Sequence, residues 1–133
     1  MIPFTFRLGL DLAEVDRIAR AIDRWGETFL ERLFNAGEVD RRRRHPAAFS
    51  QHVAGRFAAK EAAMKALGTG FRGLSFREIV VGRETSGKPN LRFQGRASRL
   101  AERLSVASVE LTITHTERTA AAVVLLVCAP PIS

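Results

Sequence analysis

The stretch from residue 55 to residue 68 constrains the fold of this chain more than any other segment. It is rich in Ala, Lys and Glu, which favour helix, and it closes with Gly68, the residue type most common directly after a helix. Successive helical residues are rotated by about 100°, which places four apolar side chains in one stripe: Val53, Phe57, Met64 and Leu67. Lys60 falls inside that stripe, so the predicted helix has to bury or divert an ammonium group.

Glu61 and Lys65 lie one turn apart along the edge of the same stripe. The simpler interpretation is a helix ion pair, because a glutamate four residues before a lysine stabilises a helix by about 0.2–0.5 kcal/mol. In that case Lys60 lays its methylenes along apolar surface and keeps its ammonium in water. The alternative is that these charges meet a charged substrate. Helix chemistry alone favours the ion pair. The choice between the two interpretations therefore depends on the rest of the chain.

The composition predicts one cytoplasmic domain that spans residues 1–133. A chain of this length with 46% hydrophobic residues can bury a core of its own. Its single cysteine, Cys128, excludes an intramolecular disulfide framework and suits a reducing compartment. We expect no signal peptide, since Met1 to Arg7 contains no basic leader followed by an apolar core. We also expect no membrane partner, because the longest apolar run, Ala120 to Ala129, is far shorter than the ~20 residues that span a bilayer.

The net charge of +7 predicts an anionic partner. Charge alone does not choose among nucleic acid, a phosphorylated ligand, an acidic protein and an anionic membrane face. Arg17, Arg20 and Arg24 recur at helical spacing and predict a basic ridge along one helix. The run from Arg41 to Arg44 is interpreted as a solvated face.

Hydrophobic periodicity predicts an α+β domain with the order β-α-α-α-β-β-α-β-β. The expected helices cover about 15–25, 29–34, 53–67 and 97–104, and the expected strands about 4–12, 76–81, 91–93, 109–115 and 121–127. In the first strand Phe4, Phe6, Leu8, Leu10 and Leu12 alternate with smaller or polar residues. We expect these large side chains to face the core and Asp11 to point away from them.

Three further residue groups have both a structural and a functional interpretation. Asp11 and Glu14 have the spacing of a capping box, and a capping carboxylate can also bind a metal. His115 ends a strand on its apolar side, where a hydrogen-bonded core histidine is the more common outcome. Gly68 to Gly70 could present amides to phosphate, although a glycine turn after a helix is normally only a cap.

Four blocks, in order, resemble one family over roughly the whole chain. That family is holo-[acyl-carrier-protein] synthase, the small phosphopantetheinyl transferases. The blocks are Leu8-Gly9-Leu10-Asp11-Leu12 with Arg17-Ile18, Gly55-Arg56-Phe57-Ala58-Ala59-Lys60-Glu61-Ala62 through Lys65-Ala66-Leu67-Gly68-Thr69-Gly70, Gly87-Lys88-Pro89, and Thr112-Ile113-Thr114-His115-Thr116 with Ala120-Ala121-Ala122-Val123.

The resemblance implies a mainly antiparallel sheet packed against the long helix, and Mg²⁺-dependent transfer of phosphopantetheine from coenzyme A to a serine of apo acyl carrier protein, for fatty acid biosynthesis. It implies Asp11 and Glu61 as metal ligands, with Glu61 and Lys65 as catalytic residues. The implied coenzyme A contacts are Lys65, Gly68, Gly87, Lys88, Pro89, His115 and Thr116. It further implies a homotrimer with sites shared between neighbours, and an acidic carrier protein that would dock on the ridge of Arg17, Arg20 and Arg24.

The alternative is a basic nucleic-acid-binding module without catalysis. It explains the net charge and the arginine ridge, but stacking platforms for single strands need exposed aromatic residues. This chain has no Tyr and one Trp, and we expect most of its nine Phe to be buried. It also leaves Asp11 and Glu61 unexplained on a surface that should repel carboxylates. We therefore expect a transferase with no nucleic-acid partner.

Overall fold

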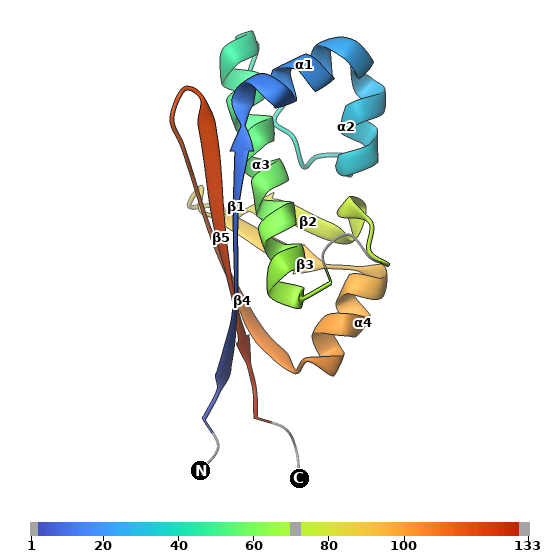
Figure 1. The fold of residues 1–133 in the computed structure, drawn as a ribbon, viewed down its shortest axis with the longest axis vertical. Coiled ribbons are helices and arrows are strands. Elements are labelled where there is room, and N and C mark those ends of the chain that lie inside the picture. The colour runs from blue at the N-terminus through green and yellow to red at the C-terminus, as the bar shows by residue number, and fades with distance from the viewer. Residues whose placement is uncertain (1–2, 70–72, 131–133) are drawn as a thin grey trace.

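The computed structural model describes residues 3–69 and 73–130, and its elements follow the predicted order (Figure 1). In chain order they are β1 (Thr5–Glu14), α1 (Val15–Trp25), α2 (Glu27–Leu33), α3 (Pro46–Leu67), the 3-10 turn η1 (Phe76–Glu78), β2 (Ile79–Arg83), β3 (Pro89–Phe93), α4 (Gly95–Arg103), β4 (Val106–His115) and β5 (Thr119–Cys128). The strand expected to begin at Phe76 begins three residues later, because Ser75 and Glu78 form a capping box that holds Phe76 to Glu78 in a 3-10 turn.

Two antiparallel sheets and one long helix organise the molecule. The larger sheet has the strand order β1-β5-β4, and the smaller sheet pairs β2 with β3. Helix α3 packs on β1 and β5, with the larger sheet on one side of it and α1, α2 and α4 on the other (Figure 1). The predicted antiparallel sheet against a long helix is therefore confirmed.

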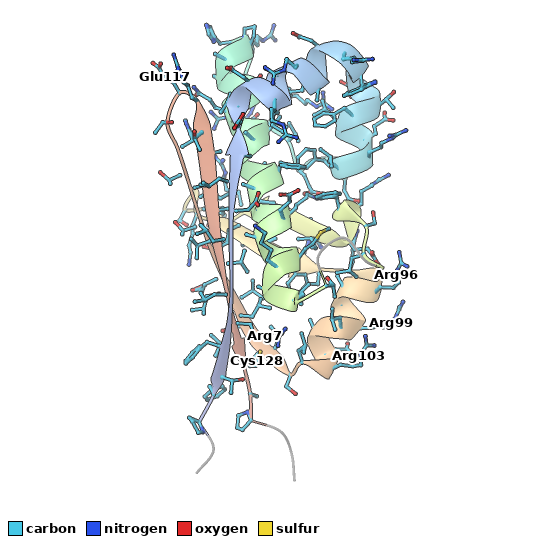
Figure 2. All side chains as sticks on the ribbon, viewed as in Figure 1. Arg7, Arg96, Arg99, Arg103, Glu117 and Cys128 are labelled. Atoms are coloured by element: carbon cyan, nitrogen blue, oxygen red, sulfur yellow. The ribbon has the colours of Figure 1, made fainter. Side chains whose placement is uncertain are left out.

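The contact between β1 and α3 is made by small residues. Six alanines of α3 are at most 2% exposed, and a Cβ atom at Gly9 would overlap the carbonyl of Ala62. Near the C-terminal end of α3, Arg7 donates from its Nε to the Ala66 carbonyl at 2.8 Å (Figure 2). Backbone thus lies almost directly on backbone, and this brings the side chain of Asp11 up to the last turns of α3.

The inner and outer faces of β1 are the reverse of the prediction. The alternation is present, but Gly9, Asp11 and Ala13 face α3, while Leu8 and Leu10 are 67% and 57% exposed. The reason is the close approach to α3, which leaves no room for large side chains on the inner face. One side of the larger sheet therefore displays a row of exposed apolar residues, namely Phe4, Phe6, Leu8, Leu10, Leu12 and Val123, here called the outer apolar face.

Two other expectations were wrong. Asp11 does not cap α1, because β1 continues to Glu14 and Glu14 occupies the N-cap position without a side-chain cap bond. Most phenylalanines are not buried either: among the described residues only Phe34 is buried, and the others are half-buried or exposed. Both errors came from local patterns that the packing of β1 and α3 overrides. None of the helices in the described ranges is both long and apolar enough to cross a lipid bilayer.

Candidate functional site

A groove of about 750 Å³ opens between α1, α2, β1 and α3. Its floor is largely apolar, with Ile18, Ala21, Phe29 and Phe57, and its α1 side carries Arg17, Arg20 and Arg24. The predicted ridge is thus confirmed as one exposed row. Glu61 lines the same groove, so the ridge borders the space next to the expected metal ligand.

Asp11, Glu61 and Lys65 come together where β1 meets α3. Lys65 Nζ lies 3.0 Å from Asp11 Oδ1 and donates to the Leu10 carbonyl at 3.0 Å. Within the described residues its ion pair is with Asp11 of β1, and the pairing with Glu61 along the helix does not form. The favoured helix interpretation is therefore wrong for Lys65.

The carboxylates of Asp11 and Glu61 lie close together and are only partly balanced by positive charge. Asp11 is 7% exposed, and its Oδ2 is buried without a hydrogen-bond partner among the described atoms. Burial raises the pKa of Glu61 to about 7, and the neighbouring Asp11 carboxylate acts in the same direction. Two carboxylates held together in this way can bind a hard cation with little rearrangement. Within the described ranges no group of three or more His, Cys, Asp or Glu side chains is suited to a metal.

Lys60, in contrast, does not belong to this site. It is fully buried and forms an ion pair with Glu38 at 2.9 Å on the far side of α3. The prediction that its ammonium reaches water, or a substrate, was wrong. The partner that its burial requires is a carboxylate 22 residues earlier in the chain.

A second, smaller hollow of about 240 Å³ lies on the other flank of α3. Its polar lining consists of Arg43, Gln51, His52, Arg56, Arg83 and His115. These six residues and Pro89 are here called the basic cradle. Burial lowers the pKa of Arg56 to about 10, with Arg83 and Arg43 acting in the same direction. Three guanidinium groups line this hollow and no carboxylate does, which suits it to an anion such as a phosphate, although Arg43 also pairs with Asp40 at 3.8 Å outside the lining.

The basic cradle contains two of the seven residues expected to contact coenzyme A, Pro89 and His115. His115 is exposed at the end of β4, not a core residue. Thr116 is used inside the adjoining turn, where its Oγ1 accepts the Thr119 amide at 3.1 Å.

The other expected contacts lie elsewhere. Lys88 follows Gly87 at the β2–β3 turn and pairs with Glu110 at 3.5 Å. The Gly68 amide, in the left-handed region at φ 83°, donates to carbonyls of the last turn of α3, so it caps the helix and does not point to a ligand. Gly70 lies outside the described residues.

The groove and the basic cradle lie on opposite sides of α3. Phe57 and Glu61 line the groove, whereas His52 and Arg56 line the cradle, and the rotation of about 100° per residue separates these two sets by nearly half a turn. The sheet shows the same separation, because β1 and β4 are its two edges with β5 between them.

Comparison with known proteins identifies the family. The model of the 4′-phosphopantetheinyl transferase superfamily matches residues 7–124. Holo-[acyl-carrier-protein] synthase from Solibacter usitatus is 46% identical over 119 residues, which cover 89% of this chain and 94% of the relative. The synthase from Maridesulfovibrio salexigens is 45% identical over 121 residues, which cover 90% and 95%. The chain belongs to the holo-[acyl-carrier-protein] synthase family.

Solved structures of the synthase family share the fold. The enzyme from Neisseria meningitidis superposes with a TM-score of 0.80 at 33% identity, covering 90% of this chain and 96% of that one. The Helicobacter pylori synthase, solved in complex with coenzyme A, gives a TM-score of 0.76 at 28% identity, covering 90% and 98%. This chain is therefore a phosphopantetheinyl transferase by family and by fold.

Sequence reasoning about this synthase-family chain missed the three arginines of the basic cradle. Arg56 lies in the block of the long helix, but the interpretation of that block rested on the charges of Lys60 and Glu61. Arg43 was assigned to a solvated run, and Arg83 carried no pattern at all. Their signal is tertiary, because the loop before α3, α3 itself and β2 contribute one arginine each.

Proposed function

We propose that the chain transfers the phosphopantetheine group of coenzyme A to a serine hydroxyl of apo acyl carrier protein, for fatty acid biosynthesis. The serine hydroxyl gives up its proton to Glu61 or to water, and its oxygen forms a new bond to the phosphorus that carries the pantetheine arm. The pyrophosphate P–O bond breaks and releases adenosine 3′,5′-bisphosphate. The observation that carries the proposal is the pair of Asp11 and Glu61 beside Lys65, in which Asp11 Oδ2 accepts no hydrogen bond from the described atoms and Glu61 lines the groove.

The donor set at this point fits Mg²⁺. That ion is typically held by one or two carboxylates, with water and substrate phosphate oxygens completing its shell. Asp11 and Glu61 would hold it, and when bound it supplies neutralisation of phosphate oxygen charge. Lys65 supplies a further positive charge next to the same carboxylates, directed by its bonds to Asp11 and Leu10.

The nucleotide part of coenzyme A is assigned to the basic cradle. Arg43, Arg56 and Arg83 give it the charge to hold a phosphate group, and Pro89 and His115 add the two contacts expected from the sequence. Its absence of lining carboxylates matches an anionic ligand. The acidic carrier protein is assigned to the groove, where the ridge of α1 supplies complementary charge and Phe29 and Phe57 an apolar floor.

A complete site then requires two copies of the chain. The carboxylate pair and the basic cradle lie on opposite flanks of α3, so that neighbouring copies, and not one copy, would present both to one coenzyme A. The outer apolar face supports such an assembly, because β1 carries four large apolar side chains that are more than half exposed, and Phe4 directly before it adds a fifth, which is unusual for a monomer. We propose a homotrimer, as the family resemblance implies.

The nucleic-acid module is the weaker alternative. More aromatic residues are exposed than expected, and Trp25 packs against Arg24 of the ridge. One exposed ring is not a stacking platform for a strand, however, and Phe4 and Phe6 lie on the outer apolar face instead. The free thiol of buried Cys128 suits a reducing compartment, so we place the reaction in the cytoplasm.

The deciding experiment is the mass of apo acyl carrier protein after incubation with this protein, coenzyme A and Mg²⁺. We expect one phosphopantetheine increment per carrier, and none with chelator or with Glu61→Gln. A carrier mass that stays unchanged with the wild-type protein would reject the function.

The shared site has its own test. Glu61→Gln and Arg56→Ala copies should each be nearly inactive alone, and co-assembled copies should regain part of the activity, since some interfaces then combine two intact halves. No recovery in mixed assemblies would show that each copy carries its whole site.

A further inference from the structure

The most deeply buried charge of the chain takes no part in the proposed reaction. Lys60 is fully buried, and its Nζ donates to Glu38 Oε1 at 3.0 Å, to the Phe76 carbonyl at 2.9 Å and to the Ile79 carbonyl at 2.6 Å. All three ammonium protons are thereby used. The Phe34 ring lies 5.0 Å away and covers the same ammonium.

Glu38 is equally well satisfied. Its carboxylate accepts from the Asn35 amide at 2.8 Å, from Asn35 Nδ2 at 2.8 Å and from the Val81 amide at 3.0 Å, besides Lys60. A buried ion pair with every hydrogen-bonding position filled is expensive to assemble from water. Such a pair adds little net stability, so its use has to lie in what it holds in place.

The pair ties the smaller sheet to the rest of the molecule. The Ile79 carbonyl and the Val81 amide belong to β2 and stand two residues apart, so they point to the same side of the strand. Lys60 and Glu38 meet them there as a further strand would. Since β2 and β3 form a sheet of their own, the pair supplies polar bonds that neighbouring strands do not.

Glu38 also contacts two of the elements that form the basic cradle, α3 and β2. Its backbone carbonyl accepts from Arg56 Nε at 2.9 Å, while its carboxylate binds β2, which carries Arg83 at its end. One residue thus fixes two cradle arginines that come from different elements. We propose that the Glu38–Lys60 pair is a positioning device that sets the spacing of Arg56 and Arg83, and thereby the affinity of the cradle for the bisphosphate part of coenzyme A.

This inference rests on the proposed function, because the cradle is assigned to coenzyme A there. Neither Glu38 nor Lys60 needs to touch the ligand. The expected signature is therefore weaker nucleotide binding with an intact chemical step: a raised KM for coenzyme A and a kcat within about twofold of the wild type. A pair that only stabilises the fold would change neither constant in protein that remains folded.

The test compares binding of adenosine 3′,5′-bisphosphate, measured by calorimetry, with the urea midpoint of each variant. Glu38→Asp keeps the charge but shortens the reach, so it cannot hold β2 and Arg56 at their present spacing; we expect about tenfold weaker binding. The double variant Glu38→Leu with Lys60→Met removes both charges together. We expect it to be more stable than Lys60→Met alone, yet to bind the bisphosphate as weakly as Glu38→Asp.

Two controls separate position from stability. Leu30→Ala lowers the urea midpoint by opening a cavity under α2, away from the cradle, and should leave bisphosphate affinity unchanged. Glu27→Gln breaks an exposed ion pair with Arg41 and should change neither quantity.

Wild-type affinity in folded Glu38→Asp would overturn the positioning role. If the double variant does not fold, Glu38→Asp decides alone. If wild-type protein itself does not bind the bisphosphate, the assignment of the cradle fails first, and the positioning role fails with it.

Discussion

The two flanks of α3 each carry a lysine–carboxylate pair, and the pairs differ in what they leave unsatisfied. On the cradle flank, Lys60 and Glu38 are buried with side chains 0% and 2% exposed, and each has several partners. On the groove flank, Lys65 is 56% exposed, and its partner Asp11 keeps a buried oxygen that accepts no hydrogen bond from the part of the chain that the structure describes. The first pair is complete by itself, whereas the second needs something more.

Whether all hydrogen-bonding positions are filled distinguishes the Lys60–Glu38 pair from the Lys65–Asp11 pair better than the burial of the lysine does. Both lysines stand on one helix, five residues apart, and both approach an apolar face. Burial lowers the pKa of Lys60 to about 8, but its three acceptors leave no position for a ligand. The unsatisfied Asp11 oxygen and the raised pKa of Glu61 support the proposal that the other flank binds an additional cation.

The largest expected effect is on stability at the cradle flank. Lys60→Met leaves the buried Glu38 carboxylate unpaired, which costs about 3–5 kcal/mol. Lys65→Met also leaves a buried carboxylate, that of Asp11, without its ion-pair partner, but the charge that is lost is 56% exposed, so the cost should be smaller than for Lys60→Met. Urea denaturation of both variants measures the free energies of unfolding. Equal losses for the two variants would erase the distinction between the flanks.

The next effect is on transfer at the groove flank. Lys65→Met removes a positive charge next to the proposed phosphate position, and we expect about a 100-fold lower kcat/KM. Lys65→Arg keeps the charge and should retain part of the activity. The measurement is initial rate of holo carrier formation at saturating Mg²⁺. Normal turnover by Lys65→Met would show that the ion pair of Lys65 has only a structural role.

The pH dependence of stability sharpens the contrast further. Burial raises the pKa of Glu61 from 4.5 to about 7, so between these pH values the folded state holds a proton that the unfolded state releases. The free energy of unfolding of metal-free protein should therefore fall as pH rises through this window. Mg²⁺ should raise the melting temperature most above pH 7, where Glu61 is ionised. Thermal melts with chelator and with Mg²⁺ test both, and Glu61→Gln should show neither trend.

The smallest effect concerns the partners of the two flanks. Reversing Arg17 and Arg20 to Glu should weaken carrier binding by about tenfold, because exposed charges steer and orient an acidic partner. Coenzyme A affinity should stay within about twofold, as the basic cradle lies on the other side of α3. Salt should shrink the difference in carrier binding, since screening acts beyond about 8 Å. Equal losses for both ligands in separate titrations would place the ridge at the nucleotide.

The order of elements was predictable because hydrophobic periodicity is local. The faces of β1 were not, since an alternating strand has two faces and only its partner decides which one is buried. A signal was present in Gly9 and Ala13, which match the alanines of α3 in size. Small residues on both elements indicate close packing, and the large side chains then have to face outward.

The site shows the same division between local and tertiary information. Asp11, Glu61 and Lys65 were named from the sequence, and the structure brings all three together. Their partners were not predicted, because the capping box and the helix ion pair are local patterns that compete with the bond from Lys65 to β1. Glu38 could not be matched to Lys60 from spacing, since a loop and β2 complete that contact.

The outer apolar face has a consequence for the newly made chain. Strand β1 is an edge of its sheet, so its large apolar side chains stand beside backbone groups that no neighbouring strand pairs. An exposed apolar edge of this kind is a template for aggregation. Copies that have not yet associated would adhere to other exposed apolar surfaces, and association with further copies would protect them. Variants that place charge at Leu8 or Leu10 should thus yield more dispersed, and less active, protein.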